Sequence, residues 1–93
     1  MVHERPIREG WPAVTVVGLG GLGSWTALAL AKCGFPISTV YDPDVVEENN
    51  ISNQMYGQDH VGLCKVQAAG SVIYEYIPEH KGITQYSREV TGS

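Results

Sequence analysis

The stretch that decides the fold is Ala13-Val14-Thr15-Val16-Val17-Gly18-Leu19-Gly20-Gly21-Leu22-Gly23-Ser24. Residues 13–17 form a short run dominated by Val and Thr, which is typical of a strand buried on both faces of a parallel sheet. The glycines that follow have the spacing Gly-x-Gly-x-x-Gly, and residues 24–33 are rich in Ala and Leu, which predicts a helix. A glycine-rich turn between a strand and a helix is the context in which this spacing predicts a phosphate-binding loop.

Each glycine of the Gly-x-Gly-x-x-Gly spacing meets a steric requirement of the loop. Gly18 permits the tight turn, Gly20 lets the backbone approach phosphate oxygens, and Gly23 lets the helix pack closely on the strand. We expect the N–H groups of residues 21–24 to point at an anion from the helix N-terminus. The alternative is a tight turn that binds no ligand, and the flanking strand and helix argue against it.

A second strand is predicted at residues 37–41, and Asp42-Pro43 ends it. Strand, turn, helix and strand in this order belong to one parallel sheet with a right-handed crossover. Asp42 lies about 20 residues after the glycine loop, where an acidic side chain accepts hydrogen bonds from the ribose hydroxyls of NAD or ATP. The alternative for Asp42 is that it starts a turn before Pro43.

The remaining sequence is less regular. Residues 44–62 are polar and predict a long loop with a helical turn or two, and loops of this length are usually functional. Apolar residues at helical spacing predict a helix over 61–76, which Pro78 ends. Residues 83–90 alternate and predict a third strand. The expected fold class is therefore α/β, with a Rossmann-like parallel sheet of about three strands and flanking helices.

Length and composition limit the function classes. The 93 residues are fewer than the ~150 of a complete doubly wound domain, so we expect one incomplete domain over 1–93. The net charge of −4 excludes a dedicated nucleic-acid binder. The chain has neither a spanning apolar run nor a secretory signal, which predicts a soluble cytoplasmic protein without membrane contact.

Cys33 and Cys64 are expected to be buried small side chains, and no metal site is predicted from cysteine or histidine spacing.

Three segments after the second strand carry a more specific pattern. They are Asp42-Pro43-Asp44-Val45-Val46, Asn50-Ile51-Ser52-Asn53-Gln54 and Val61-Gly62-Leu63-Cys64-Lys65. Together with the glycine loop they resemble the ATP-binding first half of the ThiF/MoeB family, which includes the ubiquitin-activating enzymes. The resemblance covers about residues 14–78 and rests on linked motifs in the same order.

The resemblance implies a set of site residues and a reaction. Gly18, Gly20, Gly21 and Gly23 would line the ATP phosphates, Asp42 would hold the ribose, Asn50 would contact the nucleotide and Lys65 would contact a phosphate. The compact ammonium group of a lysine suits triphosphate charge. The implied cofactors are ATP and Mg²⁺. The implied activity is adenylation of the C-terminal carboxylate of a ubiquitin-like or sulfur-carrier protein.

Two departures from the family pattern matter. Asn53 stands where the family usually has an arginine, so a bidentate phosphate donor is lost. Arg5 and Arg8 lie too close to the first strand to be the arginine that family members donate across a dimer.

The family's magnesium-associated Asp, crossover loop, catalytic Cys and zinc-binding pairs lie beyond the residues present here. No catalytic residue is therefore assigned, and whether this chain by itself is an enzyme stays open.

Three hypotheses follow from the sequence. The first is the ATP-binding part of an adenylyltransferase. The second is a non-catalytic module that binds a nucleotide or pairs with a partner, as a homodimer or with a complementary second half, because half a sheet leaves a strand edge open. The third is a fragment of an NAD-dependent oxidoreductase, which leaves Asn50, Gln54 and Lys65 unexplained.

Overall fold

The computed structural model describes residues 7–80 and 82–89. Its strands are β1 (Val14–Val17), β2 (Ile37–Tyr41) and β3 (Thr84–Tyr86), and its helices are α1 (Gly21–Cys33) and α2 (Lys65–Tyr76). Two short 3₁₀ turns, η1 (Glu48–Asn50) and η2 (Gln58–His60), lie between β2 and α2. The strands form one sheet in the order β1-β2-β3, with both pairings parallel. The predicted α/β class with a Rossmann-like parallel sheet is confirmed.

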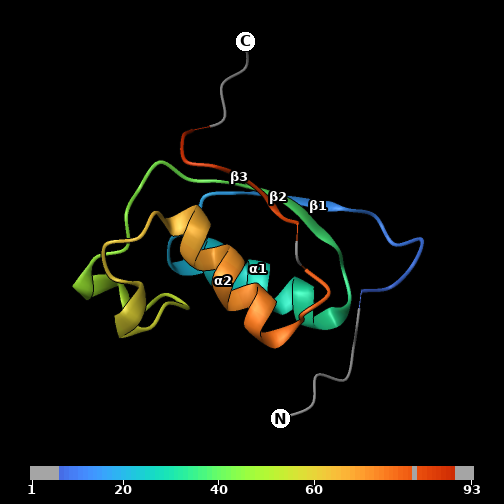
Figure 1. The fold of residues 1–93 in the computed structure, drawn as a ribbon, viewed down its shortest axis with the longest axis horizontal. Coiled ribbons are helices and arrows are strands. Elements are labelled where there is room, and N and C mark those ends of the chain that lie inside the picture. Colours follow the sequence, from blue (N-terminus) through green and yellow to red (C-terminus); the bar gives the residue numbers. More distant parts are fainter. Residues whose placement is uncertain (1–6, 81, 90–93) are drawn as a thin grey trace.

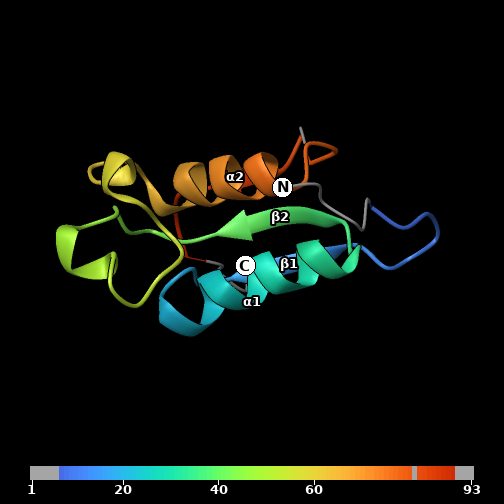
Figure 2. The ribbon, with the colours of Figure 1, turned by 90° about the horizontal axis from the view of Figure 1, so that it is seen from below.

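Both helices pack on one face of the sheet, below it in Figure 1. Figure 2 shows that the loop carrying η1 and η2 lies beyond the end toward which β2 points, so this loop stands at the carboxyl ends of the strands. The core fills the space between sheet and helices. Its fully buried members are Leu19, Ala27, Ala31, Val40, Ala68, Ala69 and Ile73.

The helix starts differ from those predicted. Helix α1 begins at Gly21 instead of residue 24, because Gly21 and Gly23 already have helical backbone. It ends at Cys33, and Gly34 caps it in the left-handed conformation (φ 106°). Helix α2 begins at Lys65 instead of residue 61. The preceding residues pair with the chain after β2 instead, since Val46 N–H donates to Leu63 O at 2.8 Å and Gly62 N–H donates to Val46 O at 2.9 Å.

Three further sequence predictions were wrong in whole or in part. The third strand spans 84–86 instead of 83–90, and residue 90 lies outside the described residues. Strand β1 is not buried on both faces: Val17 is 59% exposed, because no helix covers the upper face of the sheet and no strand pairs with the outer edge of β1 within the described ranges. Cys33, predicted to be buried, is exposed, and Cys64 is half-buried.

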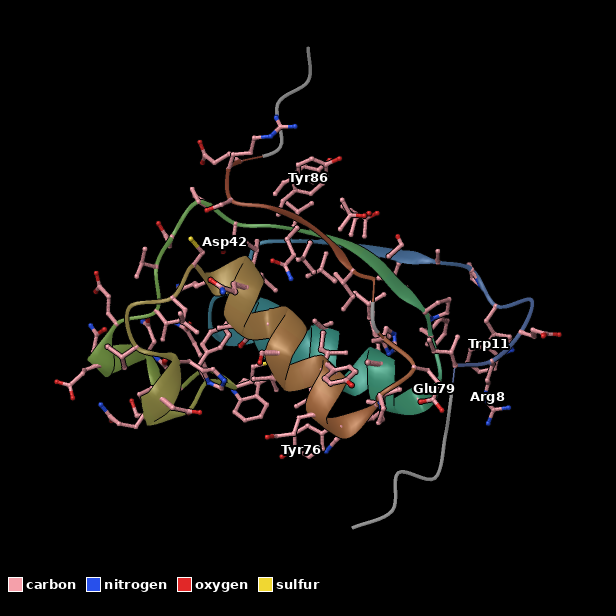
Figure 3. The ribbon with its side chains drawn as sticks, viewed as in Figure 1. Arg8, Trp11, Asp42, Tyr76, Glu79 and Tyr86 are labelled. Carbon is pink, nitrogen blue, oxygen red and sulfur yellow. The ribbon has the colours of Figure 1, made fainter. Side chains whose placement is uncertain are left out.

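The uncovered face carries a row of side chains from all three strands. Val17 pairs in register with Tyr41, and Tyr41 pairs with Tyr86. The two tyrosine rings stack with centroids 4.7 Å apart, and the Arg88 guanidinium lies 5.0 Å from the Tyr86 ring. Figure 3 shows Tyr86 on the side of the sheet away from the helices.

Neither helix in the described part of the chain has the length and apolar character needed to cross a membrane.

His80 joins the end of α2 to the start of β2. It is 5% exposed, and its Nε2 accepts a hydrogen bond of 3.0 Å from Ile37 N–H. Burial lowers the pKa of His80, and the backbone of Phe35 and Ile77 and the charge of Glu79 act in the opposite direction. A protonated Nε2 could no longer accept this hydrogen bond, so the fold requires the neutral imidazole.

We therefore expect the chain to lose stability on acidification. Because the pKa is lower in the folded state than in the unfolded state, the stabilisation is complete above about pH 6.5 and is lost as the pH falls through the folded pKa. Urea unfolding between pH 7.5 and pH 5 measures the effect, with His80→Gln as the matched variant that cannot titrate. A free energy of unfolding that falls equally in both proteins would contradict the role of His80.

Candidate functional site

The glycine loop lies between β1 and α1, and its glycines differ in the space around them. Gly18 has φ 90°, a left-handed backbone that favours glycine, and its N–H donates to Tyr41 O at 2.9 Å. A Cβ at Gly23 would lie 2.0 Å from Gly18 O, whereas a Cβ at Gly20 would meet no atom within 4 Å. Gly23 is therefore required for strand–helix packing, while Gly20 leaves open space above the loop.

The first turn of α1 presents free backbone donors. Among the described residues, the N–H groups of Gly21, Leu22 and Gly23 have no hydrogen-bond partner, as expected for the first turn of a helix. Ser24 differs from the prediction, because its N–H donates to Gly20 O at 2.9 Å and closes that turn. Three free amides at a helix N-terminus form a site suited to an anion.

Asp42 is buried at the end of β2, and both of its carboxylate oxygens bind backbone. Oδ2 accepts a hydrogen bond of 2.7 Å from Leu19 N–H, and Oδ1 accepts one of 2.8 Å from Asp44 N–H. The side chain is 5% exposed. Asp42 therefore ties the glycine loop to the chain after β2, and its contact with a ribose stays a prediction.

Lys65 and Asn50 are brought together although 15 positions separate them (65 − 50). Both line a cavity of about 260 Å³, together with Asp44, Val45 and Glu47. Lys65 is 7% exposed, and its N–H donates to Asp44 O at 2.9 Å. The Asn50 side chain accepts a hydrogen bond of 2.8 Å from Glu47 N–H and so caps η1. The backbone pairing around Val45 and Cys64 is what places the lysine beside this turn.

The predicted glycines line a different cavity. This groove, of about 470 Å³, runs along the open edge of β1 and the first turns of α1, and Leu22, Thr26 and Leu30 also line it. Asp42 lies in the lining of neither cavity. The structure thus groups the predicted residues as a glycine loop, a buried Asp42 behind it, and a separate pair formed by Asn50 and Lys65.

The segment Asn53–Tyr56 is hydrogen-bonded to the glycine loop and to the start of α1. Two of the hydrogen bonds reach α1: Trp25 Nε1 donates to Asn53 O at 3.1 Å, and Met55 N–H donates to Ser24 Oγ at 3.3 Å. The third reaches the glycine loop, where Tyr56 OH donates to Leu19 O at 2.8 Å. Asn53, the residue at the family's arginine position, therefore lies beside the first turn of α1. Tyr56 was missed in the sequence, because no local pattern reports its contact with Leu19 across 37 residues.

Arg8 lies at the other end of the molecule. Figure 3 places Arg8 and Trp11 at the end of the sheet opposite to Asp42. The Arg8 guanidinium lies 4.7 Å from the Trp11 ring, and its Nε donates to Cys33 O at 3.4 Å. Arg8 thus packs against the end of α1 and contributes nothing to the glycine loop, while Arg5 lies outside the described residues.

Comparison with known proteins identifies the family. The profile described as "ThiF family" matches residues 11–93. The chain belongs to the ThiF family. Ubiquitin-like modifier-activating enzyme 5 of Aedes aegypti is 39% identical over 82 residues, which cover 88% of this chain and 20% of that relative.

Solved structures show the same arrangement in other ThiF-like chains. The crystal structure of PaaA has a TM-score of 0.80 and 35% identity, and the match covers 87% of this chain and 25% of PaaA. The E. coli tRNA N6-threonylcarbamoyladenosine dehydratase TcdA, solved in complex with ATP, has a TM-score of 0.76 and 36% identity over 85% of this chain and 32% of TcdA. This ThiF chain therefore spans only about a fifth to a third of the length of these three relatives.

Proposed function

We propose that this chain is the ATP-binding part of an adenylyltransferase that activates the C-terminal carboxylate of a ubiquitin-like or sulfur-carrier protein. The observation that carries the proposal is the shape of the glycine loop. Three amides at the start of α1 have no hydrogen-bond partner among the described residues, and a Cβ at the neighbouring Gly20 would meet no atom within 4 Å. Family membership and the ATP complex of TcdA support the choice of nucleotide.

The residues present fit a nucleoside triphosphate. The free amides would bind phosphate oxygens, and Lys65 would add a positive charge from a cavity that opens beside η1. Mg²⁺ prefers oxygen ligands, and Asp44 and Glu47 supply carboxylates in that same cavity. These groups bind and orient the nucleotide, and ATP itself supplies the adenylyl group.

We expect isothermal titration with Mg-ATP to show saturable binding, and Lys65→Met to weaken it about tenfold to a hundredfold. The variant keeps an apolar stem of similar length and removes only the charge, which contributes about 1.5–3 kcal/mol in a hydrogen bond to a phosphate. Lys32→Met is the matched control, because Lys32 lies in the last turn of α1, where its ammonium contacts the Tyr76 ring.

Other outcomes would change the assignment. Binding of NADH in preference to ATP would favour an oxidoreductase fragment. Failure to bind either nucleotide would favour the second candidate, a non-catalytic module that pairs with a partner or with a second copy. The observation behind that candidate is the open edge of β1, where the groove is flanked by Val17 (59% exposed) and Leu22 (85% exposed).

A further inference from the structure

The backbone of Leu19 is held at both of its polar groups by side chains distant in sequence. Its N–H donates to Asp42 Oδ2 at 2.7 Å, and its carbonyl accepts from Tyr56 OH at 2.8 Å. All three residues are at least 95% buried, so water does not compete for these hydrogen bonds. The start of the glycine loop is therefore fixed from the carboxyl end of β2 and from the long loop together.

The contact with Tyr56 has a geometric consequence for the next residue. The Leu19 carbonyl and the Gly20 N–H belong to one planar trans peptide group, so they point in opposite directions. When Tyr56 OH holds the carbonyl inward, the Gly20 N–H must point outward. This N–H has no hydrogen-bond partner among the described residues, and Gly20 borders the open groove.

We propose that Tyr56 is a positioning residue that orients the Gly20 amide toward a bound phosphate, by holding the Leu19 carbonyl. The inference rests on the proposed ATP-binding function and adds a residue that no sequence motif marks. Burial and the charge of Asp42 raise the pKa of Tyr56, so its hydroxyl remains a hydrogen-bond donor at neutral pH. Met55 N–H, bonded to Ser24 Oγ, fixes the residue before it and keeps the phenol in place.

The test substitution is Tyr56→Phe, which removes one hydroxyl and keeps the buried ring. Tyr41→Phe is the matched control, because Tyr41 stacks on Tyr86 on the face of the sheet away from the helices. Hydrogen exchange measured by NMR on the ligand-free chain reports the loop directly. We expect exchange at the Leu19 amide to rise about fivefold in Tyr56→Phe, relative to the Ile73 amide in the core, since one hydrogen bond contributes about 1 kcal/mol.

Titration with Mg-ATP gives the second readout, where we expect the affinity of Tyr56→Phe to fall about threefold to tenfold. A faster Leu19 exchange together with weaker ATP binding supports the proposal. Unchanged Leu19 exchange overturns it, and so does faster exchange with wild-type ATP affinity, which would mean a purely structural hydroxyl. Absence of ATP binding in the wild-type chain instead refutes the proposed function, and the exchange data then report only whether Tyr56 holds Leu19.

Discussion

Substituting Gly23 by alanine is expected to destabilise the fold by at least about 3 kcal/mol. The new Cβ would lie 2.0 Å from Gly18 O and 2.9 Å from Gly18 C, which are backbone atoms that no side-chain rotation can move away. Relieving this overlap requires α1 to separate from the end of β1, and overpacking of this kind costs about 1–3 kcal/mol even where side chains can adjust. A chain of 93 residues has only about 5–14 kcal/mol of stability in total.

Thermal unfolding followed by circular dichroism measures this effect, and we expect the Tm to fall by about 12 °C or more. Gly21→Ala is the matched control in the same helical turn. Its Cβ would meet only Asn53 O, at an ordinary contact distance of 3.5 Å, and alanine favours helix. If the free energy of unfolding of Gly23→Ala lay within about 1 kcal/mol of the wild-type value, the close approach of α1 to β1 would be refuted.

Substituting Gly20 by alanine is expected to abolish most ATP binding while leaving the fold intact. A Cβ at Gly20 meets no protein atom within 4 Å, and the φ of Gly20 (−78°) is not in the left-handed region that favours glycine. The added methyl group instead occupies the space in which a phosphate would approach the free amides. Losing two charged hydrogen bonds costs about 3–6 kcal/mol, so the Kd for ATP should rise at least about a hundredfold.

The measurement is titration with Mg-ATP, beside a thermal melt that checks the fold. Gly82→Ala is the control, because a Cβ there also meets nothing within 4 Å and Gly82 lies just before β3, outside both cavities. Wild-type ATP affinity in a folded Gly20→Ala chain would remove Gly20 from the phosphate site. It would also remove the basis for Tyr56 as a positioning residue.

These substitutions separate two roles that the sequence motif combines. Gly23 is required by the packing of the protein itself, whereas Gly20 is proposed to leave room for the ligand. Both roles were predicted from the spacing of the glycines, because the steric demands of a tight turn act between residues adjacent in the chain. The structure adds the contact distances that make the two roles separately testable.

The position of Asp42 was predicted correctly, but its surroundings were not. Its place at the end of β2 follows from the strand pattern and from Pro43. That both oxygens would accept backbone N–H groups, from Leu19 and Asp44, could not be predicted. Those contacts exist only once β1 and β2 pair and bring their carboxyl ends together.

The sequence by itself determined the α/β class, the parallel pairing of the first two strands, the helix after the glycine loop and the ThiF family. Each follows from local periodicity or from motifs within a few residues, where backbone sterics and side-chain pattern dominate. The tertiary structure alone decided that Lys65 and Asn50 line one cavity, that β1 lies at an edge of the sheet among the described residues, and that Tyr56 holds Leu19. These depend on how the loop from 44 to 64 folds back onto β2 and α1, which is set by long-range hydrogen bonds and burial that no local pattern encodes.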